Sequence, residues 1–179
     1  MLFTKENREK TRSGAKTQTR RVIAEDAPKH YTVGDVRYMC EPYVIDSAEH
    51  TSKRQVIGEY LDDGKPFNVT LAPDEWDRFL ARKYPYSATQ ARFMYKSLAR
   101  TFVEIVGLRR EPLQAISDVG ILAEGIPQNG RMYDRYEITR SESLTRDFRT
   151  LWDSINAARG HGWDSNPTVL VVEYRLVTP

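Results

Sequence analysis

The chain has 179 residues, a length typical of one domain with a sizeable core. Charged residues make up 29% of it and hydrophobic residues 40%, as in ordinary globular proteins. The 27 basic and 25 acidic residues leave a formal net charge of only +2. This balance excludes a protein that holds nucleic acid through an overall basic charge, so any anion site must be local.

Cysteine and histidine usage indicates a reducing compartment and no structural zinc. Cys40 is the single cysteine, which excludes an internal disulfide, and His30, His50 and His161 are too scattered to form a metal site with it. The segment MLFTKENREK lacks the apolar stretch of a signal peptide, and no segment approaches the roughly 18 apolar residues of a membrane span. We therefore expect a cytoplasmic protein without membrane contact, in a microbial cell or a phage-infected host.

The first predicted element is a short helix over Lys5 to Ser13, with Thr4 as its N-cap and Gly14 ending it in a left-handed conformation. This helix is strongly polar, which predicts a surface position. The following segment GAKTQTRR should be extended, so that its side chains alternate between two faces. One face would present Lys16, Gln18 and Arg20, and the other Thr17, Thr19 and Arg21.

In the next part of the chain, a turn at Gly34-Asp35 should lead into a strand from Val36 to about Glu41. The region after Ile45 has weaker periodicity. We expect it to contain a hairpin that turns at Asp62 to Lys65. A helix should open after Ala72-Pro73, with Trp76, Phe79 and Leu80 on its apolar face.

The C-terminal half gives clearer patterns. Arg100 to Arg110 is rich in β-branched residues and predicts a strand, and Ser117 should cap a short helix that runs to Glu124 and ends at Gly125. An amphipathic helix and a final strand over Thr168 to Val177 follow. The apolar face of that helix would consist of Phe148, Leu151, Trp152 and Ile155. Strands separated by short helices, without regular βαβ alternation, favour an α+β fold with a small mixed barrel.

Four of these segments occur in an order that resembles the ASCH domain family, and in particular its phage and prophage members. They are GAKTQTRR, GDVRYMCE, LQAISDVGILAEGI and the ending LWDSIN...WDSNPTVLVVEYR. The resemblance covers nearly the whole chain except about residues 45–95. It implies a single PUA-like domain over residues 1–179, built as a small β-barrel flanked by short helices, with 45–95 as a central insertion.

The resemblance also implies a function. PUA-like domains bind RNA or modified nucleobases, and some small bacterial ASCH proteins hydrolyse the acetyl amide of N4-acetylcytidine without a metal or organic cofactor. Their catalytic lysine, threonine and glutamate correspond here to Lys16, Thr19 and Glu124. Other ASCH members are described as ribonucleases, and this chain resembles the phage subgroup more closely than the deacetylating one. Whether it is an enzyme is therefore left open.

The chemistry of these side chains is compatible with amide hydrolysis. Thr19 could attack the acyl carbon or position a water, and Glu124 could orient the base and pass a proton to the leaving amine. Lys16 could act as the base if burial or a neighbouring cation lowers its pKa from about 10.4. Arg20 or Arg21 would lower that pKa in the required direction.

Less specific interpretations stay open for each residue. The cations of GAKTQTRR could be solvated surface charges, and Lys16 with Glu124 could be a structural ion pair. In a noncatalytic module that binds RNA or a modified base, Lys16 would donate to a base edge and the remaining donors, Thr17, Arg20 and Arg21, would line the site. Ribonuclease activity ranks lowest, because no pair of histidines is arranged for it.

Two further residues could contact a ligand. Glu41 either lines the cleft or is a charge at a strand end, and Trp163 either contacts the ligand or plugs the barrel. Trp152 belongs to an apolar helical face and should be a core residue. The basic residues Lys83, Arg92, Lys96 and Arg100 could follow a phosphate backbone, although a solvated face accounts for them as well.

Overall fold

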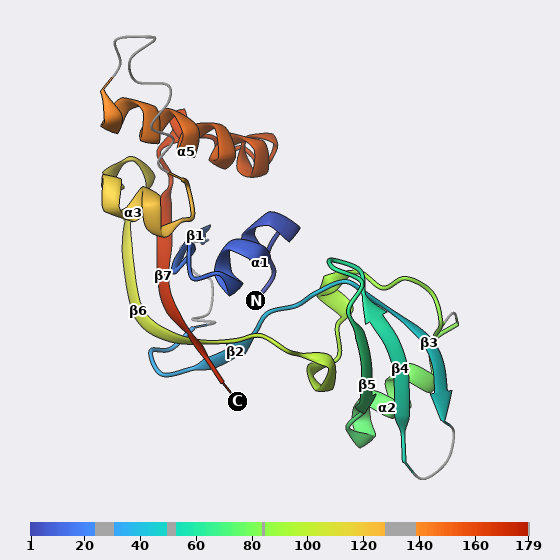
Figure 1. The fold of residues 1–179 in the computed structure, drawn as a ribbon. Coiled ribbons are helices and arrows are strands. Elements are labelled where there is room, and N and C mark those ends of the chain that lie inside the picture. The colour runs from blue at the N-terminus through green and yellow to red at the C-terminus, as the bar shows by residue number, and fades with distance from the viewer. Residues whose placement is uncertain (24–30, 50–52, 84, 128–138, 179) are drawn as a thin grey trace. The chain divides into compact units, whose positions relative to one another are not determined.

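The structure is a computed structural model that describes residues 1–23, 31–49, 53–83, 85–127 and 139–178. It is a mixed α+β fold (Figure 1). The chain separates into two compact parts: unit 1 comprises residues 1–8, 37–102 and 178–179, and unit 2 comprises residues 9–36 and 103–177. The segment 45–95, expected as an insertion, lies within unit 1.

Unit 2 contains most of a four-stranded sheet with the strand order β1-β7-β6-β2. The strands are β1 (Gln18–Val22), β7 (Thr168–Val177), β6 (Phe102–Pro112) and β2 (Val36–Tyr38). β1 pairs antiparallel with β7, so that Gln18 is opposite Glu173 and Val22 is opposite Val169. The sheet curls into a half barrel, with β6 visibly bent along its length (Figure 1). This confirms the α+β class and is compatible with a small β-barrel.

Two helices of unit 2 pack against each other near one end of β6 and β7 (Figure 1). Ser117 caps α3 (Asp118–Ala123), and Thr139 caps α5 (Arg140–Asn156) through a reciprocal pair of hydrogen bonds with Glu142. The short 3-10 helices are η3 (Leu113–Ala115), η4 (Ala157–Arg159) and η5 (Trp163–Ser165). The core between these elements includes Leu113, Ile121, Ile126, Leu144, Phe148, Trp152, Trp163, Val169 and Val171.

The predicted apolar face of α5 is confirmed at its centre and wrong at its end. Phe148 and Trp152 are buried, as expected for core residues, and their rings lie 6.2 Å apart. Ile155 is instead exposed, because the helix continues past the core before it ends at Asn156.

Unit 1 is built around a three-stranded antiparallel sheet with the order β3-β4-β5. The strands are β3 (Tyr43–Glu49), β4 (Gln55–Tyr60) and β5 (Pro66–Thr70), and the predicted turn at Asp62 to Lys65 joins the last two. α2 (Pro73–Leu80) buries Trp76 and Phe79 as predicted but leaves Leu80 exposed. η1 (Ala91–Phe93) and η2 (Lys96–Leu98) follow, and the core is formed chiefly by Tyr43, Ile45, Val56, Tyr60, Phe67, Leu71, Trp76, Phe79, Met94, Tyr95 and Leu98.

The polar helix α1 (Lys5–Arg12) is only partly a surface helix, which corrects the prediction from its composition. Arg8 is buried in unit 1, where its Nε and Nη2 donate to Asp62 at 2.5 and 2.7 Å. Thr11 is buried in unit 2, where its hydroxyl lies 3.1 Å from that of Tyr174. Polar side chains can thus occupy a buried helix face when each of them has a partner. In the described ranges, no helix is both long and apolar enough to cross a membrane.

Gly58 provides a test of how closely the strands of unit 1 approach each other. A Cβ atom at this position would lie 2.0 Å from the carbonyl oxygen of Val44 and 2.9 Å from the Cα of Ile45, both of them backbone atoms that cannot move independently. We expect Gly58→Ala to lower the free energy of unfolding by about 3 kcal/mol, measured by urea denaturation.

The matched control is Gly64→Ala. Gly64 has a φ of 65°, and no neighbouring atom lies within 4 Å of the place that a Cβ atom would take, so this change meets only backbone strain. It should cost about 1 kcal/mol. Equal losses from the two variants would contradict the close approach of β3 to β4 at Gly58.

Candidate functional site

The segment GAKTQTRR is fixed against the C-terminal end of α3 by its main chain. Gly14 ends α1 with a φ of 78°, as predicted, and the chain turns so that the Lys16 N–H donates to the Lys10 carbonyl at 3.0 Å. The Thr17 N–H then donates to the Ala123 carbonyl at 2.9 Å, and the Thr17 carbonyl accepts from Tyr174 N–H. The segment therefore lies between β7 and α3 before β1 begins.

This position brings Lys16 and Glu124 into direct contact. The Lys16 Nζ donates to the Glu124 Oε2 at 2.5 Å and to the Glu124 carbonyl oxygen at 2.8 Å. Glu124 is the C-cap residue of α3, so its carbonyl is one of those left without a partner inside the helix. Lys16 is 2% exposed and Glu124 is 5% exposed, which makes this a buried ion pair.

The same face of the segment supplies two further contacts to α3. Gln18 Nε2 donates to the Gly120 carbonyl at 3.1 Å, and Arg20 Nη1 donates to Glu124 Oε1 at 3.2 Å. Lys16, Gln18 and Arg20 thus share one face, which confirms the alternation predicted from the sequence. Both carboxylate oxygens of Glu124 are occupied by cations.

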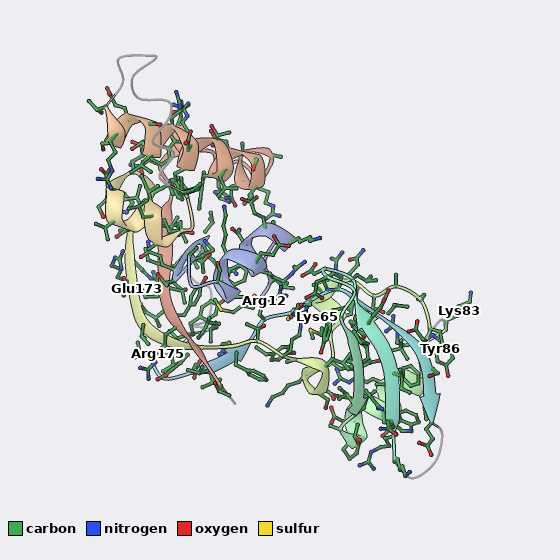
Figure 2. All side chains as sticks on the ribbon, in the orientation of Figure 1. Arg12, Lys65, Lys83, Tyr86, Glu173 and Arg175 are labelled. Carbon is green, nitrogen blue, oxygen red and sulfur yellow. The ribbon has the colours of Figure 1, made fainter. Side chains whose placement is uncertain are left out.

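A series of alternating charges extends from this pair across the sheet. Arg20 Nη2 donates to Glu111 Oε1 at 2.5 Å, and Arg109 Nε donates to Glu111 Oε2 at 2.9 Å. Arg109 also pairs with Glu173 on β7, whose position is shown in Figure 2. Glu111 and Arg109 were not among the site residues predicted from the sequence. These two residues are two positions apart in a strand, which places them on one face of the sheet, and this spacing could have indicated that they lie together.

Two glycines allow the strand and the helix to approach so closely. A Cβ atom at Gly120 would lie 3.2 Å from Arg20 Nη2 and 3.4 Å from Gln18 Nε2. A Cβ atom at Gly125 would lie 3.1 Å from the Cβ of Lys16, and Gly125 also has a φ of 84°. Gly125, which was correctly predicted to end the helix, therefore also makes room for Lys16.

Burial is the main influence on the pKa of Lys16. Removal from water is the largest influence on Lys16 and lowers the pKa of its amine below the ordinary value of 10.5. Glu124 opposes this shift, whereas the nearby cations Arg21 and Lys10 add to it. For Glu111, burial alone would raise the pKa, but the hydrogen bonds from Arg20 and Arg109 lower it overall. The lowered pKa of Lys16 increases the fraction of neutral amine.

The remaining residues predicted for this site occupy different environments. Thr17 is exposed, and Arg21 is partly exposed and near enough to Lys16 to influence its pKa. Thr19 is buried in β1 opposite Val172, and its hydroxyl makes none of the hydrogen bonds that hold Lys16 or Glu124. By strand alternation it faces away from Gln18 and Arg20.

Glu41 and Trp163 have other partners. Glu41 belongs to unit 1 and is fully buried, with Arg100 Nη2 donating to its Oε2 at 2.6 Å. It is therefore an internal charge partner of Arg100. Trp163 is buried against the ring of Phe148, at 6.0 Å and a 77° angle between planes, and belongs to the core of unit 2. His30 and His50 lie outside the described residues.

A separate shallow hollow of about 340 Å³ lies beside α5, and neither Lys16 nor Glu124 lines it. Its lining residues are Ser141, Glu142, Thr145, Arg146, Arg149 and Trp163. Within the part of the chain that the structure describes, no group of three or more His, Cys, Asp or Glu side chains is placed to hold a metal ion. Among the described residues of unit 2, the candidate site is therefore built on the buried pair of Lys16 and Glu124.

Comparisons of the chain with protein-family models, curated proteins and solved structures found no match.

Burial lowers the pKa of Lys16 and Glu124 raises it, and these opposite effects can be tested directly. We expect Glu124→Gln to lower the pKa of Lys16 further, because the carboxylate that favours the charged amine is removed while burial persists. NMR titration of the lysine Cε resonances would measure the change. Glu59→Gln, at an exposed position on β4, is the matched control. A Lys16 pKa that rises or stays constant in Glu124→Gln would contradict the arrangement.

The lowered pKa also predicts how stability varies with pH. The unfolded chain keeps the lysine proton up to about 10.5, whereas the folded chain releases it at lower pH. The contribution of Lys16 to stability should therefore increase as pH rises from its folded pKa to 10.5. Urea denaturation of the wild type and of Lys16→Met over this range would reveal it. If stability varied with pH in the same way in the wild type and in Lys16→Met, the lowered pKa of Lys16 would be contradicted.

Proposed function

We propose that this chain is a phage-type ASCH protein of the PUA-like superfamily. It binds a nucleoside or a segment of RNA at Lys16 and Glu124 and hydrolyses an acyl amide on a modified base such as N4-acetylcytidine. The main observation behind this proposal is the buried 2.5 Å contact between the Lys16 amine and the Glu124 carboxylate. The family resemblance supports it, because it implies a catalytic role for these two residues.

Each side chain has a defined task in this reaction. Lys16, with its lowered pKa, takes a proton from the attacking water, and the water oxygen bonds to the acyl carbon. Glu124 receives the proton from Lys16 across their hydrogen bond and returns it to the amine nitrogen as the carbon–nitrogen bond breaks. Arg20 holds Glu124 in position and keeps its charge balanced. A carboxylic acid and the deacylated base are the products.

Thr19 has a less direct part in this scheme. Its hydroxyl takes part in none of the hydrogen bonds that hold Lys16 or Glu124, so a water molecule is the nucleophile that fits this geometry better. Because Lys16 and Glu124 are almost fully buried, the substrate must enter past the partly exposed residues beside them. Lys10 and Arg21 are near enough to influence the pKa of Lys16, and they would meet the phosphate of a nucleotide or RNA.

A noncatalytic module that binds RNA or a modified base is the second candidate. It is favoured by the occupation of both Glu124 oxygens, one by Lys16 and the other by Arg20, because a carboxylate bound on both oxygens is well suited to holding these two cations in place. In such a module Glu124 would serve to position Lys16. Binding would then depend mainly on the cations and would weaken steeply with salt.

Hydrolysis of N4-acetylcytidine distinguishes these candidates. We expect the purified protein to release cytidine, detected by mass spectrometry, and Lys16→Ala to reduce the rate by about 10²- to 10⁴-fold because the base is lost. Glu124→Gln should keep nucleoside binding and lose turnover. Lys65→Ala is the matched control, since Lys65 is an exposed lysine in the turn between β4 and β5 of unit 1.

The result would assign the function in each case. No cytidine from any variant, with nucleoside or RNA binding that Arg21→Ala and added salt weaken, would support the noncatalytic module. Absence of both turnover and binding would reject the proposal. Equal turnover by Lys16→Ala and the wild type would show that hydrolysis occurs elsewhere or comes from a contaminating enzyme.

A further inference from the structure

Charge is strongly segregated along the sequence of unit 1. Residues 37–77 contain nine acidic and four basic residues. Residues 78–103 contain no acidic residue and six basic ones, namely Arg78, Arg82, Lys83, Arg92, Lys96 and Arg100. The near-neutral net charge of the chain therefore hides a local basic segment, which begins in the last turn of α2 and attracts anions.

This basic segment also exposes aromatic rings. Phe93 is 63% exposed and Tyr86 is 45% exposed, whereas Phe79 and Tyr95 in the same segment are buried. A single exposed apolar residue is ordinary on a protein surface. Two exposed rings in a segment with several cations and no acidic residue form a more specific pattern, because flat rings stack on nucleobases and cations contact phosphates.

Contacts within the segment hold these groups in place. The guanidinium carbon of Arg92 lies 5.4 Å from the centroid of the Phe93 ring, and the Nε of Arg92 donates to Gln90 Oε1 at 2.8 Å. The side chain of Tyr86 meets the buried Phe79 ring edge to face, with centroids 5.8 Å apart. Both exposed rings are therefore partly oriented before any ligand binds, which reduces the entropy lost on binding.

The hydroxyl of Tyr43 on β3 joins this region together. It donates to the Phe93 carbonyl oxygen and accepts from Arg82 Nη1, both at 3.4 Å. Arg82 Nη2 also donates to Thr89 Oγ1 at 2.9 Å, so the guanidinium of Arg82 is fixed close to the backbone of Phe93. Lys83 and Tyr86 are both drawn at the right-hand edge of unit 1 in Figure 2.

We propose that Arg82, Lys83, Tyr86, Arg92 and Phe93 form a basic-aromatic surface that binds single-stranded RNA. Bases stack on Phe93 and Tyr86, and the three cations contact the phosphates between them. Arg100 is not part of this surface, because Glu41 and Asp63 bind its guanidinium. The surface belongs to unit 1 and is separate in sequence from the Lys16 pair of unit 2. Only the choice of RNA as the nucleic acid rests on the proposed function.

Single strands suit this surface better than the other anionic partners. In a duplex the bases are already stacked and paired, so they cannot stack on the exposed rings. An anionic membrane would interact with the cations, but its interface also takes up apolar side chains that have no ring, such as leucine. A requirement for planar aromatic side chains therefore separates RNA from a membrane.

The test uses the full chain and a fluorescein-labelled oligouridylate of about 12 nucleotides, a length that spans such a surface. Binding is followed by fluorescence anisotropy. Phe93→Leu keeps an apolar side chain but removes the ring, and it should weaken binding about tenfold. Phe93→Trp should restore it. Arg92→Gln should weaken binding and reduce the slope of log K against log salt by about 0.7, the loss of one phosphate contact.

Controls make the outcome specific. Lys65→Gln, at an exposed lysine elsewhere in unit 1, should bind as the wild type does, and circular dichroism should show that every variant is folded. Equal affinity of Phe93→Leu and the wild type would overturn the proposal. So would a preference for oligodeoxythymidylate, or binding to phosphatidylserine vesicles but not to RNA. Loss of RNA binding in Phe93→Leu with acetylcytidine turnover unchanged would separate this surface from the Lys16 site.

Discussion

A buried carboxylate is costly unless opposite charge and hydrogen bonds surround it, and Glu124 imposes this constraint on unit 2. Lys16 and Arg20 each bind one of its oxygens, and Lys16 also binds its carbonyl. These contacts require β1 and its preceding segment to lie directly against α3. Gly120 and Gly125 make that approach sterically feasible, since a methyl group at either position would meet the side chains that hold Glu124. The position of α3 and the charge of Glu124 therefore depend on each other.

The contribution of each ion pair to stability decreases from the buried Lys16–Glu124 pair toward the exposed Arg109–Glu173 pair. The Arg20 side chain is 1% exposed, whereas those of Arg109 and Glu173 are 44% and 42% exposed. Exposed ion pairs contribute little because water competes for them and salt screens them. The inner groups, Lys16, Arg20 and Glu124, must therefore provide most of the electrostatic contribution. Within the outer groups, Arg109 lowers the pKa of Glu111 together with Arg20 and binds the Glu111 oxygen that Arg20 does not bind.

Local signals in the sequence predicted local structure well, and the long-range polar contacts were not predictable. Thr4 and Gly14, Ser117 and Gly125 mark helix ends because capping depends on adjacent residues. Alternation placed Lys16 and Arg20 on one face, and the family resemblance connected Lys16 with Glu124. The pairing of Arg8 with Asp62 depends on residues 54 positions apart, and no local pattern encodes it. The exposed ends of α2 and α5 were missed because periodicity does not show where a core ends.

The buried ion pairs of the two units differ in a way that distinguishes Lys16. Arg8 meets Asp62 through two parallel hydrogen bonds, and Arg100 donates from its Nε and Nη2 to the two oxygens of Glu41. An arginine keeps its proton in such a pair, so these contacts can fix structure but cannot exchange protons at neutral pH. Lys16, in contrast, is a buried lysine with a lowered pKa. Arg20 binds the same carboxylate, that of Glu124, and the cations Arg21 and Lys10 lie near enough to affect the pKa of Lys16. An ion pair that only stabilises the fold would be stronger with an arginine, because its guanidinium donates two hydrogen bonds to a carboxylate in a fixed geometry. A lysine in this environment is the residue that can lose its proton, and this is the property that acid–base chemistry requires.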